Sequence, residues 1–477
     1  MHKLISLLLP LCLLAQTPHD VVIKSARVLD PESGLDAIRN VAISAGKITS
    51  ITAEPLRGRT EIDGTGLVLA PGFIDLHWHG INLASGRYQL MDGVTSALEL
   101  EIGVADIPRW YADRKGKSYI NYGASIGHPP IRMAVMKDKG DFLPTGPAAS
   151  QKATPGQLEA IKLRLEEGLR LGAPAVGFGV AYTHAASYGE IIDMFRIAAK
   201  YGASCHVHMR GTSSAAGTLA DRELGLSEVI AAAAITGAKL HVVHINSSGH
   251  EATPRLLQLI GDARARGLDI TTEAYPYTAG ATRIESALFD SWVDKLPVDY
   301  QTLQWSATGE RLTRDSFLKY RKQGGLVIVH SNTEERVRQA ILSPLTMIAS
   351  DGFDVIEGQG HPRSAGTYSR ILAKYVREEK SLGLMDAIRK MTLMPAMRLE
   401  GRVPAMHNKG RVRVGADADL TIFDAAQIRD QSTYEKAAMF STGVRHVLIN
   451  GQFVVRDGKL VENIRAGQPI RAEVSKP

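Results

Sequence analysis

Histidines and carboxylates occur in this sequence at spacings that suit a metal ion. The chain has 15 histidines among 477 residues, and several of them come in pairs. His77 and His79 are two residues apart in the apolar stretch GFIDLHWH, so on a strand both imidazoles point to the same side. Glu99 and Glu101 have the same spacing in VTSALELE, with leucines on the opposite face. Buried carboxylates are costly unless a basic side chain or a metal ion balances them.

Three further candidate ligands, His208, His244 and Asp351, each close an apolar stretch later in the chain. Each of them alone can be explained without a metal ion. A single buried histidine often makes its hydrogen bonds within the core, and a buried acidic group is often paired with Arg or Lys. Four histidines and a pair of carboxylates at the ends of separate strands are harder to explain by structure alone. Imidazole and carboxylate ligands favour Zn²⁺ and, less selectively, Ni, Co or Mn.

The elements that position these residues are strands that alternate with helices over residues 71–404. Strands alternating with helices predict a parallel sheet, and eight such repeats predict a (β/α)8 barrel of the TIM type. The candidate ligands then lie at the C-terminal ends of the strands, where such barrels carry their chemistry. The expected strands are GFIDLHWH, VTSALELE, INYGASIGH, AVGFGVAYT, ASCHVHMR, KLHVVHI, DITTEAYPY and LTMIASD. Helices between them are expected to begin at Thr154, Ser187, Ser227 and Thr253.

Both ends of the chain predict a second, smaller β domain. Residues 17–70 and 405–477 contain short β-branched runs, and Asn450-Gly451 is a strong hairpin signal. Together they predict a small β-sandwich domain built from both ends. Residues 284–340 are too long for one βα unit, so we expect an insertion at the mouth of the barrel. This insertion is either a lid or an inert surface addition.

The first residues have the pattern of a signal peptide. Residues 1–16 place Lys3 before an apolar run that ends at Ala15, and this run is shorter than the roughly 20 residues of a membrane span. We therefore expect an exported protein, periplasmic or secreted. A buried first helix and an uncleaved N-terminal anchor are the alternatives. Cys12 leaves with the peptide, and Cys205 then has no partner for an intrachain disulfide.

The overall composition is that of a soluble globular protein. The chain is 44% hydrophobic and 22% charged, with a net charge of +6. This excess is thin and no block of Lys and Arg occurs, so a nucleic-acid partner is not expected. No later stretch is long and apolar enough for a membrane span. The sequence carries no signal for an oligomeric state.

Several motifs resemble a known family. The order PGFIDLHWH, HMR, HI and SDG resembles the amidohydrolase superfamily of metal-dependent barrels. YPYTAG at residues 275–280 and HPRSAGTY at residues 361–368 resemble the N-acyl-D-amino-acid deacylases, or D-aminoacylases. The resemblance implies a hydrolase of linear amide C–N bonds that deacylates N-acyl-D-amino acids through metal-bound hydroxide. Its substrate would be a small anionic amide.

The resemblance also assigns the ligands. His77, His79 and Asp351 would hold one metal ion and His208 and His244 the other, and Asp351 would accept the proton of the attacking water. The deacylases usually carry Asn-Cys-Gly at the end of the second strand, where this chain has Glu101-Ile102-Gly103. A one-residue adjustment makes Glu101 the bridging ligand, with Glu99 as second choice. The lysine that other branches carry on the fourth strand is missing.

A second departure concerns the substrate. Family members often carry a lysine two residues after the sixth-strand histidine, where this chain has Asn246. Arg363 remains to bind a carboxylate, and Tyr275 would add a hydrogen bond. His206 is expected in the core or beside the ligands, and His241 is expected to be structural. The alternatives to a deacylase are a hydantoinase-like cyclic amidase or dipeptidase and, more remotely, a non-catalytic exported binding protein.

Overall fold

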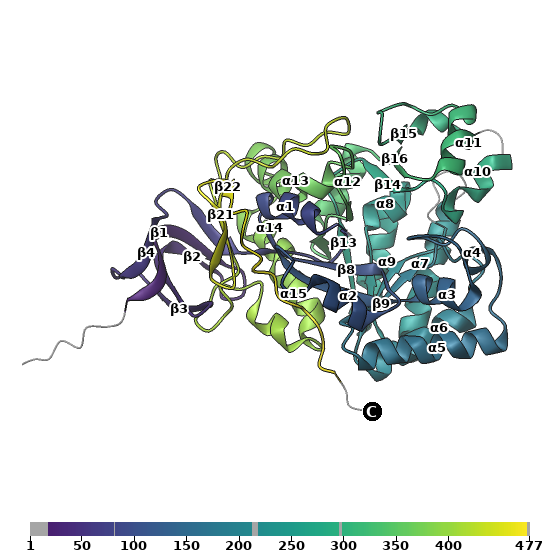
Figure 1. Cartoon of the computed structure of the whole chain (residues 1–477), viewed down its shortest axis with the longest axis horizontal. Helices are drawn as coiled ribbons and strands as arrows, with labels where there is room; N and C mark the ends of the chain where they lie inside the picture. The colour runs from purple at the N-terminus through teal and green to yellow at the C-terminus, as the bar shows by residue number, and fades with distance from the viewer. Residues whose placement is uncertain (1–17, 81, 212–217, 295–297, 475–477) are drawn as a thin grey trace, which may run out of the picture.

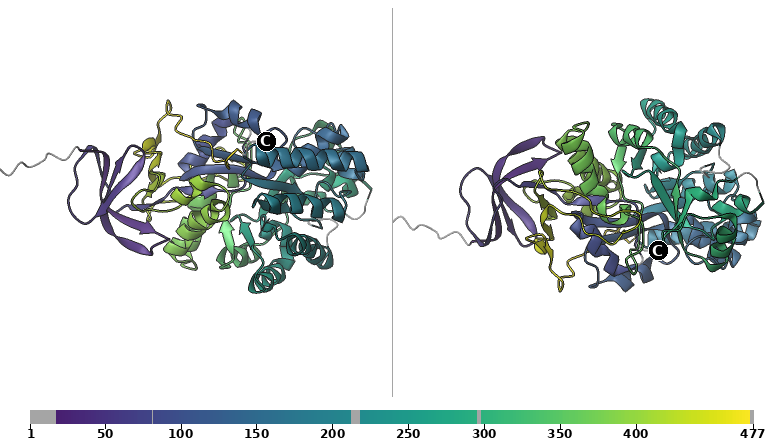
Figure 2. Two further views of the ribbon diagram at one scale, coloured as in Figure 1. Left: turned by 90° about the horizontal axis from the view of Figure 1, so that it is seen from below. Right: turned by 90° about the horizontal axis from the view of Figure 1, so that it is seen from above.

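The computed structural model describes residues 18–80, 82–211, 218–294 and 298–474. A barrel with surrounding helices and a sheet built from both ends of the chain lie side by side along the long axis (Figures 1 and 2). The expected signal peptide lies outside the described residues. Within the described ranges, no helix is long and apolar enough to cross a membrane.

Eight parallel strands form the barrel that the sequence predicts. Each strand pairs with the next barrel strand along the chain, from β6 to β17. At the seam, β7 (Trp78–His79) pairs in parallel with β18 (Gly352–Phe353), which joins the two ends of the sheet beside the candidate ligands. The strands are β6 (Phe73–Asp75), β8 (Val94–Val104), β9 (Asn121–Gly127), β10 (Ala175–Gly179), β11 (Ser204–His208), β12 (Lys239–Val242), β13 (Ile270–Ala274) and β17 (Thr346–Ile348).

Helices follow the strands and cover the outside of the barrel (Figure 2). Thr154 and Ser187 cap their helices as expected, each accepting a hydrogen bond from a backbone N–H three residues later. The helix expected from Ser227 begins instead at Leu219, because Thr218 supplies the cap and Ser227 lies inside the helix. The main helices are α1 (Gly86–Met91), α2 (Ile107–Arg114), α3 (His128–Met136), α4 (Pro147–Ser150), α5 (Pro155–Arg170), α6 (Tyr188–Lys200), α7 (Leu219–Thr236), α8 (Ile245–Gly249), α9 (Thr253–Ala265), α12 (Glu334–Leu342), α13 (Arg363–Arg370), α14 (Leu384–Met391) and α15 (Leu393–Glu400).

Both ends of the chain share one sheet of nine strands. β5 pairs with β1 on one side and with β19 on the other, so the N-terminal strands lie beside the C-terminal ones (Figure 1). Hydrogen bonds connect all nine strands into a single sheet around a shared apolar core that includes Ile23, Ile43 and Leu420. The strands are β1 (His19–Asp30), β2 (Leu35–Ser44), β3 (Lys47–Thr52), β4 (Gly58–Asp63), β5 (Val68–Pro71), β19 (Leu420–Phe423), β20 (Val444–Ile449), β21 (Gln452–Arg456) and β22 (Lys459–Leu460).

The last described residues leave this sheet, although the sequence places all of residues 405–477 in the β domain. The backbone N–H of Ile470 donates to the carbonyl of Tyr122 in β9, and that of Ala472 donates to the carbonyl of Gly172. Ile470 and Ala472 are buried in an apolar cluster that also contains Leu98. Their apolar side chains therefore hold the C-terminal segment against the barrel.

An insertion with its own core separates β13 from β17. It contains an antiparallel sheet of β14 (Ala279–Arg283), β16 (Leu326–His330) and β15 (Leu303–Trp305), with α10 (Asp290–Asp294) and α11 (Arg314–Gln323). Phe289, Trp292 and Phe317 are buried in a separate cluster within it. The expected range of 284–340 is displaced at both ends, because the sheet already begins at Ala279 and α12 contributes Val337 to the core of the barrel.

Candidate metal centre

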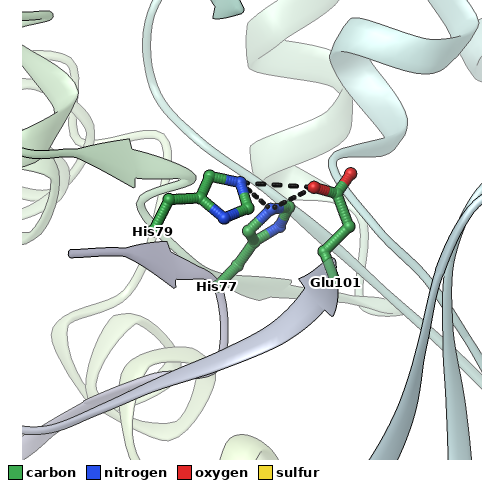
Figure 3. Close-up of side chains that lie close together, drawn as sticks. All are labelled: His77, His79 and Glu101. Atoms are coloured by element: carbon green, nitrogen blue, oxygen red, sulfur yellow. Dashed lines mark hydrogen bonds and ion pairs between the residues drawn. The ribbon is translucent and has the colours of Figure 1, made fainter. Parts of the chain in front are cut away.

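The six predicted ligands come together at one end of the barrel. All are buried, with at most 8% of any residue exposed. They come from the ends of β6, β8, β11, β12 and β17 or from the residues that directly follow, as expected for a barrel site. Figure 3 shows the rings of His77 and His79 turned toward the carboxylate of Glu101. The six predicted ligands are His77, His79, Glu101, His208, His244 and Asp351.

Glu101 lies between two pairs of histidines. Its Oε2 is 3.3 Å from His77 Nε2 and 3.2 Å from His79 Nε2. Its Oε1 is 2.8 Å from His208 Nδ1 and 3.1 Å from His244 Nε2. One carboxylate oxygen therefore faces each pair, which is the arrangement that a bridging ligand requires. The nitrogen and oxygen donors fit Zn²⁺ and similar divalent ions.

Asp351 completes the first pair. Its Oδ1 is 3.3 Å from His77 Nε2 and 3.4 Å from His79 Nε2, and its Oδ2 is 2.8 Å from a terminal nitrogen of Arg363. Asp351 has a φ of +51° and His244 a φ of +31°, a left-handed conformation that residues other than glycine rarely adopt. Backbone strain of this kind is common at functional sites, and here it occurs in the turns that carry two of the candidate ligands.

Two further carboxylates orient the first pair of histidines from behind. Glu99, the second choice as bridging ligand, has Oε2 2.5 Å from His79 Nδ1 and accepts hydrogen bonds from two backbone N–H groups through Oε1. Glu273 on β13, which the sequence analysis missed, has Oε1 2.5 Å from His77 Nδ1. Such partners select the ring tautomer that leaves Nε2 facing the metal site. The available signal was a lone carboxylate inside the apolar strand DITTEAYPY.

His241 and His206 lie deeper in the barrel. His241 Nε2 is 2.9 Å from the second oxygen of Glu273, and its Nδ1 is 2.7 Å from the hydroxyl of Thr271. His241 therefore holds Glu273 in place. His206 Nε2 is 3.0 Å from the hydroxyl of Ser204, and the His206 ring lies 4.6 Å from that of His241. His206 is thus part of the polar core beneath the ligands.

Charge within the buried site shifts the pKa values of both ligand types. Burial opposes ionisation of Glu101, but His77 and the hydrogen bond from His208 outweigh it and hold the pKa of Glu101 well below its usual range. Burial is likewise outweighed at Asp351, whose pKa is lowered by Arg363. For His77, the carboxylates of Asp351 and Glu101 overcome burial and raise the pKa well above its usual value. Ionised carboxylates thus create a field that favours a cation among the ligands.

The predicted substrate-binding residues separate into two groups. A cavity opens onto His79, Glu101, His208, His244 and Asp351, and we call it the catalytic cavity. Arg363 lines this cavity beside Asp351, as expected. Asn246 and Tyr275 do not line it. Asn246 is fully buried and donates its side-chain amide to the carbonyl of Tyr275, and the Tyr275 ring packs 4.7 Å from the guanidinium of Arg363. Tyr275 therefore packs against Arg363, and Asn246 holds the backbone of Tyr275. The cavity wall contains Ser247 and other residues that were not expected from the sequence.

Comparison with known proteins shows which family the chain belongs to. The signature of the amidohydrolase family matches residues 124–455. The chain belongs to the amidohydrolase family. In this amidohydrolase, the matched region contains His208, His244 and Asp351, whereas His77 and Glu101 precede it.

Relatives of this amidohydrolase match almost its whole length. The N-acyl-D-glutamate deacylase of Alcaligenes xylosoxydans xylosoxydans is 28% identical, with 91% of this chain and 93% of its own covered. The D-aminoacylase of the same organism is 25% identical, with 91% and 94% covered. The crystal structure of N-acyl-D-glutamate deacylase from Bordetella bronchiseptica, complexed with zinc and a phosphonate inhibitor, has a TM-score of 0.79 at 24% identity, with 96% and 100% covered. The fold is therefore shared over the full barrel and the end sheet.

Proposed function

We propose that this amidohydrolase removes the acyl group from N-acyl-D-amino acids with one or two divalent ions, zinc being the first candidate. The observation that carries the proposal is the carboxylate of Glu101, which has one oxygen on each histidine pair, with Arg363 beside the site. The activities of the relatives named above support the choice of substrate. The supporting chemistry is that of a metal-dependent hydrolase of linear amides.

Two tasks of the proposed reaction fall to side chains of the protein: proton transfer and binding of the substrate carboxylate. A divalent ion held by the candidate ligands would lower the pKa of water enough to supply hydroxide at neutral pH, and it would polarise a carbonyl. Asp351, at the first histidine pair, accepts the proton of the attacking water and returns it to the leaving nitrogen. Arg363 Nε is buried without a hydrogen-bond partner among the described residues, which leaves a donor for the carboxylate of the substrate.

The two other candidate functions explain fewer of the features of the site. A cyclic amidase of the hydantoinase type would need a lysine on the fourth barrel strand, and β10 has none. In this proposal the carboxylate of Glu101, with one oxygen toward each histidine pair, takes the bridging role instead of a lysine. A non-catalytic binding protein would have no need of six buried ligands around one point.

The proposed function is tested with a chiral and structural substrate panel. The zinc-supplemented protein is offered N-acetyl-D-leucine, N-acetyl-L-leucine, a hydantoin and a dipeptide, and acetate or amine release is measured. We expect turnover of the D-amide and its loss after treatment with a chelator. Turnover of the hydantoin or the dipeptide alone would contradict the proposal, and binding without turnover of any of the four would favour the non-catalytic alternative.

We also propose that the chain is exported to the periplasm or the medium. The sequence of residues 1–16 supports this, as does the position of β1, which begins at His19, so that cleavage near Gln16 leaves the end sheet complete. Mass spectrometry of the protein from the periplasmic fraction should give an N-terminus near residue 17. An intact Met1 in that fraction would indicate an uncleaved anchor.

A further inference from the structure

One wall of the catalytic cavity is apolar and is built from separate segments of the chain. Ile102, Leu143 and Tyr182 form a small buried cluster, and Phe142 and Leu288 pack against it. All five residues, which we call the apolar wall, line the cavity. The ring of Phe142 lies 5.3 Å from that of the ligand His79, and the ring of Tyr182 lies 5.0 Å from that of the ligand His208. The apolar wall is therefore next to the reaction centre.

Besides the proposed metal ions, positively charged side chains occur at one place in the cavity. Among the described residues that line it, Arg363 is the only lysine or arginine. His250 also lines the cavity, but burial lowers its pKa to about 4, so its ring is neutral at pH 7. The Nδ1 of His250 is 3.0 Å from the carbonyl of Ser331 and must donate to it, which leaves Nε2 as an acceptor. An acceptor nitrogen does not bind a carboxylate.

The single guanidinium has room for one carboxylate. One terminal nitrogen of Arg363 contacts Asp351, the other donates to the carbonyl of Ala281 at 3.3 Å, and the Tyr275 ring covers one face. Every N-acyl amino acid carries an α-carboxylate, which would take the Nε donor that is left without a partner among the described residues. A second carboxylate, on a glutamate or aspartate side chain, would meet the apolar wall with no cationic side chain to pair with it. Desolvation of an unpaired charge is strongly unfavourable, whereas an apolar side chain gains free energy when it is buried there.

We propose that the apolar wall binds the side chain of the substrate, so that the enzyme selects N-acyl-D-amino acids with aliphatic or aromatic side chains over acidic ones. This inference rests on the proposed deacylase function. This selectivity would differ from that of the N-acyl-D-glutamate deacylases to which the chain is similar. The charge of the side chain, more than its size, is the property that the wall rejects.

The inference is tested by comparing kcat/KM for the N-acetyl derivatives of D-leucine, D-phenylalanine, D-glutamine and D-glutamate. Glutamine and glutamate have nearly the same shape, so their ratio reports the effect of charge. We expect leucine and phenylalanine to exceed glutamate by at least about 100-fold, with glutamine between them. Glutamate cleaved as well as leucine overturns the inference and leaves the deacylase function standing. Hydrolysis of none of the four overturns both.

A charge added to the wall provides a second, independent measurement. Leu288 is partly exposed on the insertion, so Leu288→Arg places a cation on the wall without filling a sealed core. We expect this variant to raise the glutamate-to-leucine ratio of kcat/KM by at least about 10-fold. Leu163→Arg, at a position 68% exposed on α5, is the matched control and should leave the ratio unchanged. If Leu288→Arg changes all four substrates equally, the wall does not contact the side chain.

A second substitution at the same position tests the inference even if Leu288→Arg does not fold. Leu288→Ala removes apolar contact area and adds no charge, so it should raise KM for the phenylalanine derivative several-fold, with a smaller effect on the glutamine derivative. Melting temperature and metal content of both variants are compared with those of the native enzyme. An unchanged KM for phenylalanine in a folded Leu288→Ala enzyme would place the side chain elsewhere in the cavity and overturn the inference.

Discussion

Glu101 differs from the other ligands because its two oxygens face different histidine pairs. A carboxylate is a harder ligand than a cysteine thiolate and suits a wider range of divalent ions. It is also not subject to thiol oxidation. With Glu99 and Glu273 behind the two histidines of the first pair, that half of the centre is held by carboxylates on both sides.

Asp351 is expected to separate metal binding from catalysis. In Asp351→Asn the amide keeps an oxygen donor near His77 and His79, so the metal content should be retained. The amide does not accept a proton from water, so kcat should fall by at least about 100-fold. Metal analysis and initial rates on the same preparation check both halves of this expectation. Amide hydrolysis at the native rate by the fully loaded variant would show that Asp351 is not the proton acceptor.

At the scale of residues, the sequence predicts the types of the candidate ligands and the face of the barrel on which they lie. It does not predict whether Glu99 or Glu101 lies between the histidine pairs. Alternation alone places Glu99 and Glu101 on the same inner face. The pairing of β8 with β9 shifts register after Glu99, and this irregularity carries Glu101 toward the centre while Glu99 stays behind His79. The role of Asn246 was also out of reach, because its burial beneath Tyr275 depends on contacts between distant segments.

At the scale of elements, the barrel is well predicted because its eight strands are short apolar runs with clear helix signals between them. Boundaries are less predictable, as the start of α7 at Leu219 shows, since a serine inside a helix has the same local signal as one at its cap. The insertion was open to two interpretations. Leu288 and Val329 from the insertion line the catalytic cavity, so the insertion is part of the site and not an inert addition.

Lys390 links an outer helix to the last barrel strand and should make stability depend on pH. This buried side chain on α14 donates to the carbonyls of Ser343 and Thr346, and burial lowers its pKa from 10.5 to about 8. Between these values the unfolded chain binds more protons than the folded one, so the free energy of unfolding rises with pH through this window. The full effect is about 3 kcal/mol.

The measurement is the melting temperature of the native enzyme and of Lys390→Met between pH 7 and pH 10. The native enzyme should gain stability relative to the variant as the pH rises. Lys436→Met, at an exposed position, is the control and should show a constant difference. A native-minus-variant difference that shrinks with rising pH would have the wrong sign for this account.

At the scale of the whole molecule, one buried carboxylate joins the end sheet to the barrel. Asp419 accepts hydrogen bonds from Lys409 Nζ at 2.6 Å and from the side-chain amide of Asn121 in β9 at 2.8 Å. Its other oxygen accepts from the backbone N–H of Asn450 at 2.7 Å. Residues from the barrel and from the C-terminal half of the sheet thus meet at one side chain, which explains why the two parts pack as one body (Figure 1).

Removal of the cation at this junction should destabilise the molecule and spare the metal centre. Lys409→Met leaves Asp419 buried without its cation and should cost about 3–5 kcal/mol of unfolding free energy. Lys47→Met breaks an ion pair with Asp417 in which the lysine side chain is 44% exposed, and it should cost at most about 1 kcal/mol. The free energy of unfolding of both variants is measured by denaturant unfolding and compared with that of the native protein. Equal losses would mean that the buried pair does not join the two parts.

The most direct test of the account is a metal titration of the chelator-stripped enzyme, followed by the initial rate of acetate release from N-acetyl-D-leucine. We predict no turnover by the stripped protein, recovery as zinc is added, and saturation after one or two equivalents. In Glu101→Ala the same titration should show weakened zinc binding and no recovery. Turnover by the stripped protein at the native rate, or native zinc binding and activity in Glu101→Ala, would contradict the account.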